Sequence, residues 1–186
     1  IAITRGMQRL MPKILCISAS NVGGIGHEGT SAKAGRIIGE LIRGTKPETM
    51  FELSSLVNSQ LQPCTMCATC LGTDRCAHDP AFNELFNRMV WADGLLLVVP
   101  HYALIPAKLT IVLEKLQEFA FLHGYNKLPG DFTLAGKPVG LVVHGGMVES
   151  EEVIKYYRGA LLEPLSNALK GIGMRVVPLQ GGMPQG

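Results

Sequence analysis

Four cysteines in one short segment are the residues whose type and spacing point most directly to chemistry. Cys64, Cys67 and Cys70 are each separated by two residues, and Cys76 follows after five more. Consecutive two-residue spacings let a short chain present several thiolates to the corners of a cubane iron–sulfur cluster. Structural zinc sites more often use two separated Cys-x-x-Cys pairs. A 4Fe-4S cluster is therefore the first hypothesis, zinc the second, and cysteines without metal the third.

The segment 18–31 is the second candidate, because it is rich in glycine and hydroxyl side chains. It contains four glycines and four hydroxyl residues, namely Ser18, Ser20, Thr30 and Ser31. Amides at the start of a helix are unpaired and partly positive, and hydroxyls donate hydrogen bonds to phosphate oxygens. No Gly-Lys-Ser/Thr and no tight Gly-x-Gly-x-x-Gly is present, which argues against a nucleoside triphosphate loop and a dinucleotide fingerprint. The segment predicts a site for a single phosphate group without an obligatory metal.

The elements that must position these residues follow from the hydrophobic pattern. Short apolar runs predict strands at residues 13–18, 49–56, 95–99, 139–143 and 175–179. Helical periodicity between them predicts helices that start at Thr30 or Ser31, Asp79-Pro80, Pro106 and Ser150. Pro164 is expected to kink or restart the last helix. This alternation predicts an α/β fold, a five-stranded parallel sheet within a three-layer sandwich.

Two strand orders are compatible with this alternation, and both place ligand loops at the carboxyl ends of the strands. The loops to search are therefore those after the first, third and fourth predicted strands. If the second strand lies beside the first, the cysteine segment emerges at the same edge of the sheet as the phosphate loop. Cys16 lies inside the first strand and is predicted to serve packing alone.

At this point the sequence resembles a known family, the NAD(P)H-dependent FMN reductases of flavodoxin-like fold, and within them the iron-sulfur flavoproteins. The resemblance spans about residues 13–182 and combines six short motifs with the cysteine cluster that follows Pro63. The motifs are Ser18-x-Ser20, Gly29-Thr30-Ser31, Ala92-Asp93-Gly94, Pro100-x-Tyr102, Pro106-Ala107-x-Leu109 and Gly145-Gly146. Each motif is weak by itself, and together they are specific.

The resemblance implies a role for each loop. The FMN phosphate would be held by Ser18, Ser20, Thr30 and Ser31. The isoalloxazine would lie along Pro100, His101, Tyr102, Ala103 and Leu104, and its other edge would be closed by His144, Gly145 and Gly146. The implied activity is a hydride transfer from NADH or NADPH to FMN, followed by electron transfer to an acceptor, through a cluster if one is present. No side chain is predicted to act as a catalytic acid or base.

Three alternatives stay open beside this hypothesis. An electron-carrier flavoprotein would shuttle electrons without nicotinamide turnover, and a cluster-free FMN or quinone reductase would leave the cysteines without metal. A zinc-stabilised α/β domain would bind no flavin. The chain also departs from the family pattern: segment 18–31 lacks the usual Pro-Arg, so amides, hydroxyls and His27 are left to hold the phosphate. Thr110 stands where a Lys is usual, and Glu114 replaces an Asp.

Bulk composition favours one ordinary folded domain. The chain has 186 residues, 47% of them hydrophobic and 17% charged, with a formal net charge of +2. We predict a leader at 1–12 and a flavodoxin-like FMN-binding domain at 13–186, with a cysteine-rich insert at 63–78. After the fifth predicted strand the chain stops without the usual closing helix, so either a tail is missing or something else covers that face.

The same numbers guide predictions about partners and location. Dispersed positive residues argue against nucleic acid, and no apolar run approaches the ~20 residues of a membrane helix. Residues 1–12 lack the apolar core of a secretory signal, so a cytoplasmic location, where thiols stay reduced, is expected. The family resemblance implies a homodimer or homotetramer.

Overall fold

The computed structural model describes residues 11–22, 29–102, 104–125 and 132–177. Five parallel strands form one sheet: β1 (Lys13–Ser18), β2 (Met50–Ser55), β3 (Gly94–Pro100), β4 (Pro138–His144) and β5 (Arg175–Val176). Their order, β2-β1-β3-β4-β5, is the flavodoxin-like one and decides between the two predicted arrangements. The α/β prediction with a five-stranded parallel sheet is confirmed. The predicted fifth strand is shorter than expected, and its residues 178–179 lie outside the described part, as does most of the predicted leader 1–12.

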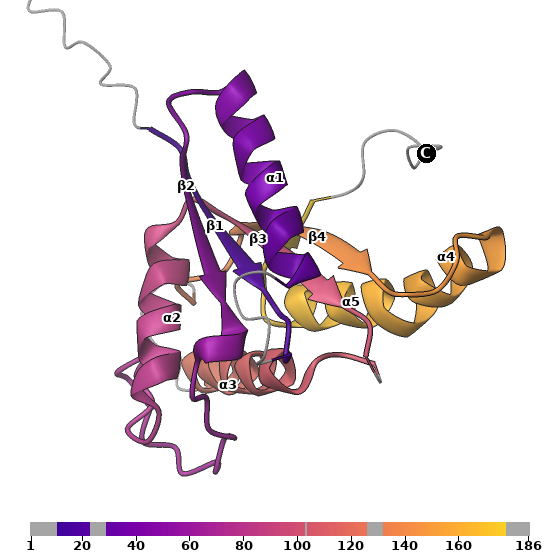
Figure 1. The fold of residues 1–186 in the computed structure, drawn as a ribbon. Helices are drawn as coiled ribbons and strands as arrows, with labels where there is room; N and C mark the ends of the chain where they lie inside the picture. Colours follow the sequence, from indigo (N-terminus) through magenta and orange to yellow (C-terminus); the bar gives the residue numbers. More distant parts are fainter. Residues whose placement is uncertain (1–10, 23–28, 103, 126–131, 178–186) are drawn as a thin grey trace, which may run out of the picture.

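Helices cover both faces of this sheet (Figure 1). One face carries α1 (Thr30–Thr45) over β1, β2 and β3. The other carries α2 (Pro80–Trp91), α3 (Ala107–Tyr125) and a helical run made of α4 (Glu151–Tyr157), a π-helical turn (Arg158–Leu162) and α5 (Glu163–Gly171). Pro164, which was predicted to kink or restart the helix, lies in the first turn of α5 directly after the π-helical turn, so the helical run continues but changes its hydrogen-bond pattern just before this proline. A 3-10 turn, Leu56–Asn58, follows β2.

Strand register explains why the sheet is buried on both sides. Leu15 of β1 pairs with Leu95 of β3, which pairs in turn with Val139 of β4, and all three belong to the main core. That core continues into α2, α3 and α5. Cys16 points to the opposite face, where a Cβ added at Gly35 of α1 would lie 2.9 Å from the Cys16 sulfur. Cys16 is fully buried, which confirms its predicted packing position.

The helix starts show which capping predictions hold. Asp79 accepts a hydrogen bond from the Phe82 amide at 2.9 Å, and Ser150 accepts one from the Val153 amide at 3.3 Å, as predicted. The predicted cap of α1 at Thr30 or Ser31 is wrong, because the capping residue is Gly29 and no side chain caps this helix. Ser31 instead directs its hydroxyl to another loop, as described below. Within the described residues, no helix combines the length and apolar character needed to cross a bilayer.

Candidate functional site

The loops that leave β1, β3 and β4 converge on one cleft of about 280 Å³. It is lined by Ser20, Val22, Gly29, Thr30, Ser31, Pro100, His101, Tyr102, His144, Gly145 and Gly146. Nine of these eleven residues are among the predicted binding residues. Of the other predicted residues, Ser18 is buried at the end of β1, Leu104 is exposed outside the lining, and Ala103 lies outside the described residues.

Hydrogen-bond donors gather where α1 begins. The first-turn amides of a helix have no intrahelical acceptor, and α1 carries no acidic side chain in its first turn. Ser31 is buried there, at 2% exposure. The Ser18 hydroxyl is fully buried and finds no hydrogen-bond partner among the described residues. The free first-turn amides and the Ser31 hydroxyl make this end of the cleft suit an anionic ligand that accepts several hydrogen bonds. The unpartnered Ser18 hydroxyl lies at the end of β1, outside the cleft lining.

A hydrogen bond joins the loop after β1 to the loop after β3. The hydroxyls of Ser20 and Tyr102 are 2.9 Å apart, and the Val22 amide donates to the Ser20 hydroxyl at 3.3 Å. The Tyr102 side chain is 44% exposed. Its ring therefore offers an aromatic surface to a ligand instead of filling the core.

His144, the last residue of β4, connects the end of that strand to α1. Its Nε2 lies 2.9 Å from the Ser31 hydroxyl, and its carbonyl accepts a hydrogen bond from the His101 amide at 2.7 Å. Burial lowers the pKa of His144, which favours the neutral imidazole at pH 7. The family resemblance implied a position for His144 at the ring edge of a flavin. In the structure its side chain contacts Ser31 at the start of α1.

The Gly145-Gly146 turn has one position that requires glycine. A Cβ at Gly145 would lie 1.9 Å from the Tyr157 hydroxyl oxygen, whereas a Cβ at Gly146 would meet nothing within 4 Å. The neighbouring Tyr156 hydroxyl is 3.2 Å from the Nε2 atom of His101. Sequence reasoning did not single out these two tyrosines. Their position at the end of the short helix that Ser150 caps, soon after the Gly-Gly turn in the sequence, was the available signal.

The four predicted metal ligands, Cys64, Cys67, Cys70 and Cys76, line a second, very small cavity of about 20 Å³, which has room for about one water molecule. All four are free thiols. Across the described ranges of the chain, no three Cys, His, Asp or Glu side chains are grouped so that they could hold a metal ion. The predicted metal site is therefore not confirmed.

Buried charges hold the base of the cysteine segment. The Asp79 carboxylate accepts hydrogen bonds from Lys115 Nζ at 2.6 Å and from the Gln62 amide at 2.8 Å. The side chains of Asp79 and Lys115 are 0% and 2% exposed. Lys115 Nζ is also 3.6 Å from the Cys76 sulfur. Sequence reasoning missed Lys115, because a lysine in a helix is usually exposed and nothing local predicts its distant carboxylate partner.

The thiols of this segment differ in acidity. Hydrogen bonds with Thr69 and Thr65, together with the nearby His78, lower the pKa of the exposed Cys67 to about 6. Burial raises the pKa of Cys70. Three non-glycine residues here have positive φ: Met66 at 51°, Ala68 at 55° and Asp74 at 47°. The segment therefore presents one reactive thiolate on an irregular, tightly turning chain.

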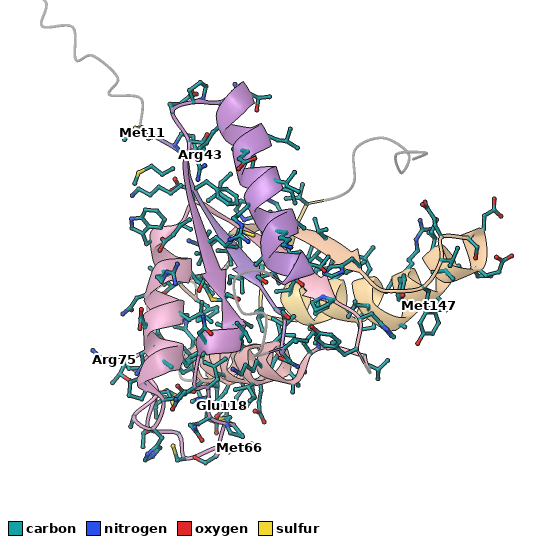
Figure 2. The ribbon with its side chains drawn as sticks, in the orientation of Figure 1. Met11, Arg43, Met66, Arg75, Glu118 and Met147 are labelled. Carbon is teal, nitrogen blue, oxygen red and sulfur yellow. The ribbon has the colours of Figure 1, made fainter. Side chains whose placement is uncertain are left out.

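The cleft and the cysteine segment line two separate cavities. Because β2 pairs with β1, the segment does leave the predicted edge of the sheet. However, the two cavities share no lining residue. From Ala107, at the start of α3, to Lys115 is ~12 Å of helix. Figure 2 shows Met66 of the cysteine segment well apart from Met147, which follows the Gly-Gly turn.

A doubly wound parallel sheet with a ligand cleft at its switch point defines a flavodoxin-like α/β protein. Comparison with known sequences then gives the family. The sequence model of the NADPH-dependent FMN reductases matches residues 12–180, so this chain belongs to that family. By its description, this family reduces FMN with NADPH.

Individual relatives are more distant. An iron-sulfur flavoprotein from Methanosarcina thermophila is 30% identical over 74 residues, which is 39% of this chain and 37% of that protein. The match thus spans little more than a third of the curated relative. The flavoenzyme NAD(P)H:(acceptor) oxidoreductase FerB from Paracoccus denitrificans has a TM-score of 0.60 at 13% identity, over 91% of this chain and 77% of that chain. An azoreductase from Bacillus anthracis has a TM-score of 0.59 at 15% identity, over 90% of this chain and 86% of that chain. At these identities the structures show the fold alone.

Proposed function

We propose that this chain binds FMN in the cleft between the loops after β1, β3 and β4 and uses it for NAD(P)H-dependent oxidoreduction. One observation carries the proposal: the hydroxyl and amide donors at the start of α1 line the same cleft as the aromatic ring of Tyr102 and the Gly145-Gly146 turn. Ser20, Thr30 and Ser31 line the cleft and would hold the phosphate, with Ser18, buried at the end of β1 outside the lining, as a further donor. Pro100, His101 and Tyr102, together with Gly145-Gly146, would hold the ring. Leu104 is exposed outside the cleft lining, and Ala103 lies outside the described residues.

FMN, when bound, supplies hydride acceptance from a nicotinamide and onward electron transfer. The residues of the chain bind and orient it. Tyr102 offers its half-exposed ring for stacking, and its hydroxyl is held by Ser20. Gly145 leaves the space that Tyr157 occupies, which keeps the turn close to the cleft. No described lining residue is Asp, Glu, Lys or Arg, so neutral donors and histidine are available for the phosphate.

A flavin titration tests the proposal directly. Flavin-free protein should quench the fluorescence of FMN on binding, and anaerobic NADPH or NADH should then bleach the flavin absorption. Binding followed by bleaching supports the reductase. Binding without bleaching would favour the alternative of an electron-carrier flavoprotein. Absence of FMN binding would contradict both.

The cysteine segment supports a finer, second proposal, an iron-sulfur flavoprotein with a 4Fe-4S cluster. Support comes from the two-residue spacings, from the convergence of all four cysteines on one cavity and from the similarity to a protein of that name. As arranged, the described thiols do not fit a cluster, so the segment would have to close on it. The alternatives remain zinc, or a cluster-free FMN or quinone reductase.

Anaerobic reconstitution separates these alternatives. Iron and sulfide should give a brown protein if the segment takes a cluster, and zinc alone should give a colourless protein with one bound metal. The variant Cys67→Ser should lose the metal in either case, while Cys16→Ser in the core should keep it. A protein that retains neither metal would leave the cluster-free reductase as the function.

We also propose a homodimer or homotetramer, a cytoplasmic location and an electron acceptor that reaches the open cleft. Exposed apolar side chains near the cleft, at Leu104, Met147 and Val148, support contact with another surface. All five cysteines are free, which suits a reducing compartment. Light scattering after size-exclusion chromatography would give the oligomeric state.

A further inference from the structure

We propose that His144 is the cationic partner of the flavin phosphate, and that FMN binding takes up a proton at its imidazole. This inference rests on the proposed function and deepens it. It assigns the positive charge that the glycine-rich segment lacks. It also makes the affinity for FMN, unlike that for riboflavin, depend on pH.

The position of the imidazole carries the inference. His144 Nε2 lies 2.9 Å from the hydroxyl of Ser31, which is buried in the first turn of the 16-residue helix α1. A phosphate held by the Ser31 hydroxyl and the first-turn amides would therefore lie beside this imidazole. His144 is fixed from the other side, since its carbonyl accepts the His101 amide at 2.7 Å.

The charges around the cleft leave this role to His144. A phosphate monoester carries about −1.5 to −2 charges at pH 7. The titratable groups among the described lining residues are His101, Tyr102 and His144, and none is Asp, Glu, Lys or Arg. His101 directs its Nε2 to the Tyr156 hydroxyl of α4 at 3.2 Å, away from α1.

Neither the cleft lining nor the first turn of α1 places a described acidic side chain beside His144. Tyr157 of α4 lies over the Gly145 turn that follows His144, and α1 has no acidic side chain in its first turn. His27 and Glu28 of the same loop lie outside the described residues, so the experiment below includes His27.

Proton uptake follows from the two environments of the ring. In the free protein burial lowers the pKa of His144, so the imidazole is mostly neutral at pH 7 and its Nε2 can accept from Ser31. An adjacent phosphate dianion favours the imidazolium and raises the pKa. The protonated ring donates to Ser31, whose hydroxyl proton is then free to point at the phosphate. Because the bound form holds the proton more tightly, affinity is highest at low pH and falls as pH rises.

The experiment measures FMN and riboflavin affinities by fluorescence quenching from about pH 6.5 to about pH 8.5, a range in which the phosphate stays mostly dianionic. We expect the dissociation constant of FMN to rise about tenfold over this range. That of riboflavin, which lacks the phosphate, should stay constant. Calorimetry in buffers of different ionisation enthalpy should detect up to one proton taken up with FMN and none with riboflavin.

Three matched variants locate the effect. His144→Gln keeps a polar nitrogen near Ser31 but cannot titrate, so its FMN affinity should be flat with pH and equal to the weak high-pH value. Its riboflavin affinity and far-UV circular dichroism should match the parent, which excludes misfolding. His101→Gln and His27→Gln should both retain the pH dependence.

The outcomes separate this inference from the proposed function. FMN binding with no pH dependence, or an equal dependence for riboflavin, would overturn the inference and leave the function standing. Loss of the dependence in His27→Gln, or its persistence in His144→Gln, would also overturn it. A protein that binds FMN at no pH would overturn both.

Discussion

The cleft and the cysteine segment are organised by different means. In the cleft, three loops at strand ends are joined by hydrogen bonds between distant positions, Ser20 with Tyr102 and Ser31 with His144. The cysteine segment lies between β2 and α2 and contains almost no regular structure. Its main buried anchor is the Asp79–Lys115 pair at its base.

The difference shows what a parallel sheet provides to a binding site. Strand ends are held in register by the ladder, so polar groups placed there are positioned before any ligand binds. The conformation of the cysteine segment, which no strand ladder holds, depends on the buried Asp79–Lys115 pair and on any group that its cysteines bind. Metal sites often complete their geometry only when the metal is present. We therefore expect the cleft to be ready for its cofactor and the cysteine segment to be the more adaptable region.

Removing Lys115 should have the largest effect, because it breaks the anchor of the cysteine segment. Lys115→Met leaves the buried Asp79 carboxylate without its 2.6 Å partner. An uncompensated buried charge costs about 3–5 kcal/mol, and the free energy of unfolding in urea should fall by that amount. The exposed Lys33→Met on α1 should change it by less than ~0.5 kcal/mol.

The loss of stability at low pH tests whether Asp79 is the partner of Lys115. Burial by itself raises the pKa of Asp79, but hydrogen bonds from Lys115, Gln62 and Phe82 outweigh burial and hold that pKa below its ordinary value. The stability that Asp79 contributes is then present above its unfolded pKa of about 4 and lost as pH falls through the folded value. The double variant Asp79→Asn, Lys115→Met should recover part of the stability and lack this acid component. Equal stability of the single and double variants would contradict the assignment.

Gly145→Ala tests whether the cleft is as closely built as its hydrogen bonds indicate. The added methyl group would displace Tyr157, because a Cβ atom at position 145 would lie 1.9 Å from the Tyr157 hydroxyl oxygen. Overpacking of this kind costs ~1–3 kcal/mol, so the FMN dissociation constant should rise by about tenfold or more. Gly146→Ala meets nothing within 4 Å and should change it less than about twofold. Equal effects of the two variants would show that the turn adapts.

Thiol reactivity tests the adaptability of the other region. With a pKa of about 6, Cys67 is mostly thiolate at pH 7. In metal-free protein, iodoacetamide should modify it about tenfold faster than an ordinary thiol, with a rate that falls as pH drops below about 6. Cys16, whose pKa burial raises to about 12, should not react. Mass spectrometry of the alkylated peptides measures the modification of Cys67 and of Cys16. If the rate for Cys67 had its pH midpoint near the ordinary thiol value of about 8.5, the prediction would be contradicted.

Ser20→Ala should give the smallest change. It removes one cross-loop hydrogen bond, 2.9 Å from the Tyr102 hydroxyl, and a single bond contributes ~1 kcal/mol to stability. Tyr102→Phe removes the same bond from the other side. A double-mutant cycle by urea unfolding should show a coupling energy of that size, and additive effects would mean that this bond does not join the loops.

Much of the fold and of the cleft could be predicted because the signals are local. The apolar run 13–18 and the Asp79 and Ser150 caps depend on residues within a few positions of one another. The convergence of the cleft residues follows from the rule that parallel strands end at one edge. The strand order could not be predicted, because both arrangements satisfy the same hydrophobic pattern.

The contacts that decide the chemistry were not predictable. Ser31 satisfies every sequence rule for a capping residue, yet its hydroxyl lies against His144, 113 positions away. Lys115 looks like an ordinary helical lysine, yet it is buried against Asp79, 36 positions away. Nothing near these residues in the chain encodes their partners.

The sequence by itself determined the alternation of strands and helices, the candidate phosphate loop and the four-cysteine spacing, because periodicity, capping and motif spacing are short-range properties. Only the tertiary structure decided which donors face one another across the cleft, which lysine is buried beside the cysteines and how far the two regions stand apart. Those relations depend on how the strands order themselves and how the helices pack on them, and packing is a property of the whole chain.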